Sequence, residues 1–226
     1  MTAAEFAAAV LEYRFSEHRF DPQALGAAAR SVAEAGLLLV GEPHGVRETP
    51  SVLFALAREL DTRALALEWS HEELDAQVQA FVRDGHLDLE ALWRLPPEAE
   101  FFCGDGRITA GHFALLERLR KEGRLEQVVL FDRLDPDPLP EWQVRDREMA
   151  ERLLAEWRGA PLLVLTGGFH AQLRGDTMAA HLARARPGLS SASLDYGHAE
   201  LPETPIALRL PPGSGSVVPR HLHFRG

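Results

Sequence analysis

The chain has 226 residues, of which 46% are hydrophobic and 26% are charged, and its formal net charge is -10. This length suits one large domain, and the composition excludes a chain that is disordered throughout. An acidic chain without a basic cluster is a poor candidate for binding nucleic acid or an anionic membrane surface. Cys103 is the only cysteine, which excludes an intrachain disulfide.

The N-terminal segment MTAAEFAAAVLEYRF predicts the first turns of an amphipathic helix. It lacks the basic start of a signal peptide, and Glu5 interrupts its small apolar run. No stretch of the sequence approaches the roughly 20 apolar residues that span a bilayer. We therefore expect a cytoplasmic protein with a small-molecule substrate, no nucleic-acid partner and no membrane partner.

Short apolar runs alternate with longer helical patterns along the chain. The runs comprise Leu37–Gly41, Ala64–Glu68, Val128–Asp132, Leu162–Gly167, Ala192–Asp195 and Ile206–Leu210. Continuous apolar runs separated by helices predict an α/β fold, with a mostly parallel central sheet and helices on both faces. We expect one domain over residues 1–210 and a C-terminal extension over 211–226, because the sequence PPGSGS is typical of a flexible connector.

The segments between these runs have helical spacing. Thr49 and Pro50 predict the N-cap and the first residue of one helix. Further helices are predicted over residues 71–83, 108–121, 141–157 and 174–185. Residues 95–107 and 134–140 have the composition of loops.

Carboxylates and imidazoles follow the strands at their carboxyl ends, which is where ligands bind in open α/β sheets. Glu42 and His44 follow the first run, Glu68 ends the second, and His170 follows the fourth. The format G-x-x-H occurs at both histidines, so two imidazoles from separate strands could flank one pocket. Solvated loop side chains are the alternative at Glu42 and His44, and a hydrogen-bonded structural residue is the alternative at His170. Asp132 ends the third run and is predicted to be a loop cap.

Arg145 and Asp146 fall on or beside the inward stripe of the helix predicted at 141–157. Charged side chains on an inward stripe need partners. A structural ion pair and an arginine aimed at an anionic group are both compatible with this placement. The sequence contains no G-x-G-x-x-G after a strand, no Walker A motif and no G-x-S-x-G, so a nucleotide-binding or serine-hydrolase assignment has no support.

The ordered set of motifs resembles the superfamily that joins the erythromycin esterases, the haem-binding ChaN lipoproteins and the TIKI/TraB proteins. The resembling residues are Leu39–Glu48, Ala66–Glu68, Leu130–Asp132, Arg145–Ala150 and Gly167–His170. The erythromycin esterase branch is the most similar, because its first motif continues as H-G-x-x-E, as His44 to Glu48 does here. In that branch the histidine of this motif is thought to activate water, with glutamates and an arginine in support. The TIKI branch implies a metal-dependent site, and the ChaN branch implies haem binding.

The leading hypothesis is a hydrolase acting on an ester, lactone or related acyl bond. His44 would take a proton from water, Glu42 or Glu68 would orient the imidazole, and Arg145 or His170 would stabilise the oxyanion. In a metal-assisted variant, one Zn, Mn, Co or Fe ion would be held. Its ligands would be Glu42, His44, Glu68 and His170. The alternative is a haem- or tetrapyrrole-binding protein with a histidine or Tyr196 as axial ligand, and a scaffold without activity is a third reading.

Overall fold

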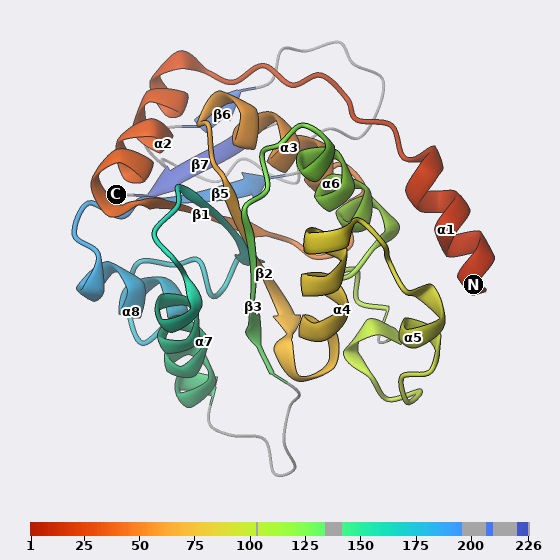
Figure 1. The fold of residues 1–226 in the computed structure, drawn as a ribbon. Coiled ribbons are helices and arrows are strands. Elements are labelled where there is room, and N and C mark those ends of the chain that lie inside the picture. Colours follow the sequence, from red (N-terminus) through yellow and green to blue (C-terminus); the bar gives the residue numbers. More distant parts are fainter. Residues whose placement is uncertain (103, 134–141, 196–206, 210–220, 226) are drawn as a thin grey trace.

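The computed structural model describes residues 1–102, 104–133, 142–195, 207–209 and 221–225 (Figure 1). A seven-stranded sheet forms its centre, in the order β3-β2-β4-β1-β5-β7-β6. The strands are β1 Leu37–Glu42, β2 Ala64–Ser70, β3 Gln127–Asp132, β4 Leu162–Gly167, β5 Ser191–Asp195, β6 Ala207–Arg209 and β7 His221–Arg225. Strands β1 to β5 run parallel to one another. Strand β7 is antiparallel to both of its neighbours, β5 and β6. The predicted α/β fold with a mostly parallel sheet is thereby confirmed.

Helices cover both faces of the sheet, and every residue of β1 to β4 is buried. The helices are α1 Ala3–Glu12, α2 Pro22–Ala35, α3 Thr49–Glu59, α4 His71–Asp84, α5 Leu89–Trp93, α6 Ala110–Lys121, α7 Trp142–Glu156 and α8 Met178–Ala185. One core packs Val52, Leu74 and Phe113 against the sheet. The other core packs Met149 of α7 and Met178 of α8 against the opposite face. Figure 1 shows α7 and α8 on one side of β3 and α4 and α6 on the other.

Two helices were not predicted from the sequence. Helix α2 buries only small side chains, namely Ala24, Ala27, Ala28, Ser31 and Ala35, so it has no stripe of large apolar residues. Its start is nevertheless clear, because the Asp21 carboxylate accepts from the backbone N–H groups of Gln23 and Ala24. Helix α5 has only 5 residues, which is too short to show a periodic apolar pattern.

Several predicted helix boundaries are corrected by the structure. The N-cap of α3 is Glu48, and Thr49 is the first helical residue. Helix α8 begins at Met178 instead of Arg174, because the Thr177 side chain accepts from the backbone N–H of Ala180 and caps it there.

Residues His221–Arg225, which the sequence placed in an extension, form β7 and pair with β5 along its whole length. In the described ranges, no helix is both long enough and apolar enough to cross a bilayer.

Candidate functional site

The candidate site lies at the carboxyl ends of β1, β2 and β4. Glu42 ends β1 in register with Gly167, which ends β4. Strand β2 pairs with β4 only as far as Leu67, and its register against β3 shifts between Leu67 and Ser70. Glu68 lies at this irregularity, so its side chain reaches towards β4 from a strand that has left the regular ladder.

Glu68 is the centre of the site, because both of its carboxylate oxygens are engaged. Oε2 accepts from the Thr166 hydroxyl and from the backbone N–H of Gly167, each at 2.6 Å. Oε1 lies 4.0 Å from His44 Nε2 and 3.7 Å from His170 Nε2. The side chain is only 4% exposed, so these fixed partners set its orientation. Two imidazoles from separate strands therefore face one carboxylate oxygen.

Each imidazole is held from behind by a second carboxylate. His170 Nδ1 lies 2.8 Å from Asp146 Oδ1, and His44 Nδ1 lies 3.4 Å from Glu42 Oε1. Asp146 and Glu42 are both buried, at 0% and 3% exposure. A carboxylate at Nδ1 favours the tautomer that carries its proton there, which leaves Nε2 as the acceptor of the neutral ring. The two Nε2 atoms are thus available on the side of Glu68.

Both histidines bind protons more tightly than an isolated imidazole. Burial opposes the charged form of His44, but the hydrogen bond to Glu42 and the charge of Glu68 outweigh it and raise the pKa of His44. Burial likewise opposes the charged form of His170. The hydrogen bond to Asp146 and the charge of Glu68 outweigh it and raise the pKa of His170. Burial also raises the pKa of Glu42, and the nearby charge of Glu68 adds to this. Both imidazoles therefore keep their protons to a higher pH than an isolated histidine does.

Gly167 keeps the space between the two imidazoles open. A Cβ at this position would lie 3.1 Å from His44 Nε2 and 3.5 Å from His170 Cδ2. Both histidines remain reachable from solvent, because their side chains are 26% and 15% exposed. The absence of a side chain at Gly167 therefore leaves both imidazoles uncrowded and open to water.

Arg107 belongs to this site, although its sequence context did not single it out. Its Nη1 atom lies 3.5 Å from Glu68, 3.2 Å from Asp132 and 3.1 Å from Glu100. The Arg107 carbonyl accepts from Trp69 Nε1 at 2.9 Å, which fixes the loop over the end of β2. From the sequence, Arg107 looks like any arginine in a glycine-rich surface turn. Only the fold shows that it lies at the edge of the sheet, beside Glu68.

Asp132 is a buried ion-pair residue, and the prediction of a loop cap was wrong. It is 0% exposed and accepts from Arg145 Nε at 3.0 Å as well as from Arg107. The Arg145 guanidinium therefore lies on Asp132, and the guanidinium that faces Glu68 belongs to Arg107. Asp146 binds His170 and the backbone N–H of Met178. Tyr196 and Cys103 lie outside the described residues.

The proposed metal ligands do not form a metal site in this arrangement. Glu42 lies behind His44, on Nδ1, so it does not share a side with Glu68 and His170. The position nearest Glu68 Oε1 is taken by the Arg107 cation, which would repel a divalent ion. Within the part of the chain that the structure describes, no group of three histidine, cysteine or acidic side chains has the geometry to hold a metal ion.

Comparisons with known proteins find a likeness at the level of the fold. No family model and no curated protein matches the chain. A solved structure described as bacterial protein toxins superimposes with a TM-score of 0.54 and 13% identity, over 85% of this chain and 39% of the toxin. The RRSP effector domain of a MARTX toxin from Vibrio vulnificus superimposes with a TM-score of 0.50 and 17% identity, over 75% of this chain and 35% of that chain.

The C-terminal region of Pasteurella multocida toxin gives a TM-score of 0.52 and 11% identity, over 85% of this chain and 26% of that chain. That toxin is described as having a thiol-protease like catalytic triad. The chain spans well under half the length of each of these toxin chains. At these identities the likeness establishes a shared fold.

Proposed function

We propose that the protein is a hydrolase that cleaves an ester, lactone or related acyl bond with water. The observation that carries this proposal is the pair of Nε2 atoms, 4.0 and 3.7 Å from one oxygen of Glu68, each backed by its own buried carboxylate. General acid-base catalysis requires imidazoles that are oriented and whose pKa lies near the working pH. The resemblance of the strand-end motifs to the erythromycin esterases supports the same chemistry.

The two histidines divide the proton transfers between them. Neutral His44 accepts a proton from water at Nε2, and the resulting hydroxide equivalent attacks the acyl carbon. Glu42 stabilises the imidazolium that forms. His170, charged at Nε2 under the influence of Asp146, donates its proton to the oxygen that leaves. One proton is taken from water and one is given to the leaving group, so the step balances.

The remaining charges hold this machinery in place. Arg107 lies between Glu68, Glu100 and Asp132, so it compensates a concentration of buried negative charge. In the sequence-based hypothesis Arg145 stabilised the oxyanion, but its guanidinium is engaged by Asp132. We therefore assign a positioning role to Arg145, and the charge of His170 stabilises the oxyanion before its proton passes to the leaving oxygen.

An exposed aromatic pair beside His170 indicates which substrates fit. Phe169 is 51% exposed and Trp142 is 45% exposed, and their ring centroids lie 4.9 Å apart. Phe169 also contacts the His170 ring, with centroids 5.7 Å apart. Large exposed aromatic side chains next to a polar site are typical of substrate contacts. We infer a substrate with an aromatic or bulky apolar group next to the scissile bond.

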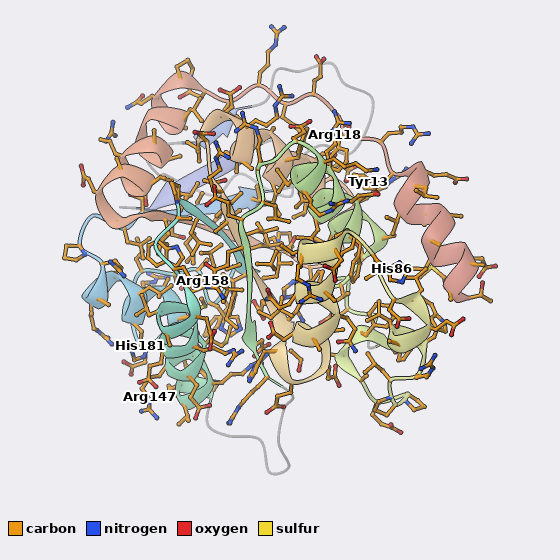
Figure 2. The ribbon with its side chains drawn as sticks, viewed as in Figure 1. Tyr13, His86, Arg118, Arg147, Arg158 and His181 are labelled. Atoms are coloured by element: carbon orange, nitrogen blue, oxygen red, sulfur yellow. The ribbon has the colours of Figure 1, made fainter. Side chains whose placement is uncertain are left out.

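The test is a panel of aryl esters, aryl lactones and aryl amides, assayed with the wild-type chain and single variants. We expect His44→Gln and His170→Gln each to lower kcat/KM by about 10²-fold or more, the usual worth of a general acid or base. The control is His86→Gln, because His86 is exposed and lies near α5, away from the site (Figure 2). Unchanged circular dichroism and melting temperature would show that the variants fold. Hydrolysis that survives both substitutions would refute the proposal.

A thiol mechanism is tested in the same panel. Cys103 is the only cysteine of the chain, and a thiol-protease like triad is described for one structural neighbour. We expect Cys103→Ser to retain activity, because the proposed nucleophile is water. Loss of amide and ester hydrolysis in Cys103→Ser, with His44→Gln equally inactive, would replace the water mechanism by a cysteine nucleophile.

A further inference from the structure

A second cleft lies away from the Glu68 site, between α3, α6 and the segment that joins α1 to α2. Its volume is about 850 Å³, and its lining residues come from positions 10–19, from α3, from α6 and from Arg124 just after α6. Figure 2 shows Tyr13 and Arg118 at this end of the molecule, far from Arg147 and His181. None of its lining residues belongs to the candidate hydrolase site.

Positive charge collects in this cleft, although the whole chain carries a formal net charge of -10. The cationic lining residues are Arg14, Arg19, Arg58, Arg118, Lys121 and Arg124, against the carboxylates of Glu17, Glu59 and Glu117. Arg118, Lys121 and Arg124 pair with carboxylates at 2.9, 2.9 and 2.7 Å. Among the described residues, Arg14, Arg19 and Arg58 take part in no ion pair. Their charges are thus available to a ligand.

Two aromatic rings line the cleft, and one of them contacts two of the guanidinium groups. Phe15 and Phe54 pack with centroids 4.8 Å apart. The guanidinium carbons of Arg58 and Arg118 each lie 5.7 Å from the centre of the Phe54 ring. Cation–π contacts of this kind restrict the arginine side chains before any ligand binds. The cleft therefore offers an apolar surface bordered by ordered cations.

His18 supplies the second observation that points to a ligand. Both of its ring nitrogens are buried and lack a hydrogen-bond partner in the described part of the chain, and the residue lines the cleft. Burial lowers the pKa of His18, so its ring is neutral and offers one donor and one acceptor. Buried polar atoms without partners are rare in folded proteins. Because these nitrogens are closed off from the cleft as the ring stands, a polar ligand would pair with them only after the ring turns towards the cleft.

We infer that this cleft binds a small organic anion, namely a phosphate ester joined to a flat apolar group. Arginine, which supplies all but one of the cations, matches phosphate oxygens through its planar fork of N–H donors. The apolar group would lie against Phe15 and Phe54, and the phosphate would lie between Arg19 and Arg58. This site is independent of the proposed hydrolase, so either can fail without the other.

The inference is tested by titration calorimetry of the intact chain at low salt with adenosine monophosphate, phenyl phosphate, inorganic phosphate and adenosine. We expect the two phosphate esters to bind at least about tenfold more tightly than inorganic phosphate, and adenosine not to bind at millimolar concentration. Higher salt should weaken the binding, because the anion is held by charge.

Arg58→Gln and Arg19→Gln should each weaken ester binding about tenfold, as expected for one charge-assisted contact. The matched control is Arg147→Gln, an exposed arginine on α7 in the opposite layer (Figure 2), which should leave the affinity within about twofold. Two variants are used so that one folding defect does not decide the outcome. No ester binding at millimolar concentration, equal losses in all three variants, or equal binding of adenosine would each overturn the inference.

Discussion

His170 is held by Asp146 through a 2.8 Å contact between Nδ1 and Oδ1, across 24 residues of sequence. The same Asp146 oxygen accepts from the backbone N–H of Met178, the first residue of α8, at 2.6 Å. One buried carboxylate of α7 therefore ties together the start of α8 and an imidazole at the end of β4. The raised pKa of His170 depends on this side chain together with the charge of Glu68.

Asp146→Asn should shift the pH profile of hydrolysis. The pKa of His170 is raised, and His170 acts in its charged form, so activity is lost only as the pH rises through that raised value. The amide removes the negative charge, so the pKa of His170 falls and the corresponding limb of the profile moves to lower pH. Proton NMR of the imidazole, alongside kcat/KM from pH 5 to 9, measures both effects.

The same variant tests the contribution of this pair to stability. Because the folded pKa of His170 is raised, its stabilising effect is fully present below pH 6.5 and is lost as the pH rises through the folded value. Asp146→Asn should therefore lower the free energy of unfolding by about 1–3 kcal/mol at pH 5.5, and by less at pH 9. An equal loss at both pH values would contradict the assigned ion pair.

Gly167→Ala should strongly lower activity without unfolding the protein. The new methyl group would lie 3.1 Å from His44 Nε2 and 3.5 Å from His170 Cδ2, where the reacting water is expected. We expect kcat/KM to fall about 10²-fold, because a displacement of about 1 Å in such a site is costly. The matched control is Gly168→Ala, whose Cβ would lie 3.7 Å from the Glu42 carbonyl oxygen, an ordinary contact distance. Activity retained in Gly167→Ala would place the reacting water elsewhere.

Glu100 should make the protein less stable as the pH rises from 4.5 to 7. Burial raises its pKa to about 7, although the Ser70 N–H and the Arg107 charge oppose this shift. In this interval the folded chain keeps the proton and the unfolded chain releases it, so the free energy of unfolding falls with pH. The total effect is about 3 kcal/mol, since one pKa unit corresponds to about 1.4 kcal/mol.

Denaturant melts across this pH range compare wild type with Glu100→Gln, which cannot ionise. The variant should show a flatter dependence on pH, whereas Glu98→Gln, at an exposed position of the same loop, should follow wild type. Parallel curves for wild type and Glu100→Gln would show that Glu100 titrates normally.

Phe169→Ala should raise KM for aryl substrates about threefold to tenfold and leave kcat nearly unchanged, because it removes an apolar contact made equally in the ground and transition states. Trp142→Ala should act in the same direction, since the two rings contact each other. Leu11→Ala, which alters another exposed apolar residue on α1, serves as the control. A fall in kcat with unchanged KM would argue against substrate contact at Phe169.

The fold could be largely predicted from the sequence, since every strand of the parallel sheet coincides with a run of apolar residues. Leu37–Gly41 and Leu162–Gly167 are buried on both faces, and burial on both faces is what removes polar residues from a strand. Helix α2 was not predicted, because alanine and serine form its buried face and leave no stripe of large apolar residues. Pairing of β7 with β5 could not be foreseen either, because it joins segments on both sides of a long connection.

The residues of the candidate site were predicted more completely than their contacts. Glu42, His44, Glu68 and His170 do meet at one edge of the sheet, as their places at strand ends require. The arrangement of Arg145 on Asp132 and of Asp146 on His170 could not be derived from helical spacing. Spacing places residues on a face of a helix, but it does not specify what lies opposite.

The amino-acid sequence by itself determined the parallel α/β architecture and the gathering of acidic and imidazole groups at the strand ends, because both follow from local apolar periodicity and chain direction. Only the tertiary structure decided that Arg107 reaches Glu68, that each imidazole has its own carboxylate, and that an arginine-lined cleft lies between α3 and α6. These contacts join residues far apart in the chain. Their distances depend on how the packed elements close on one another, which no local pattern encodes.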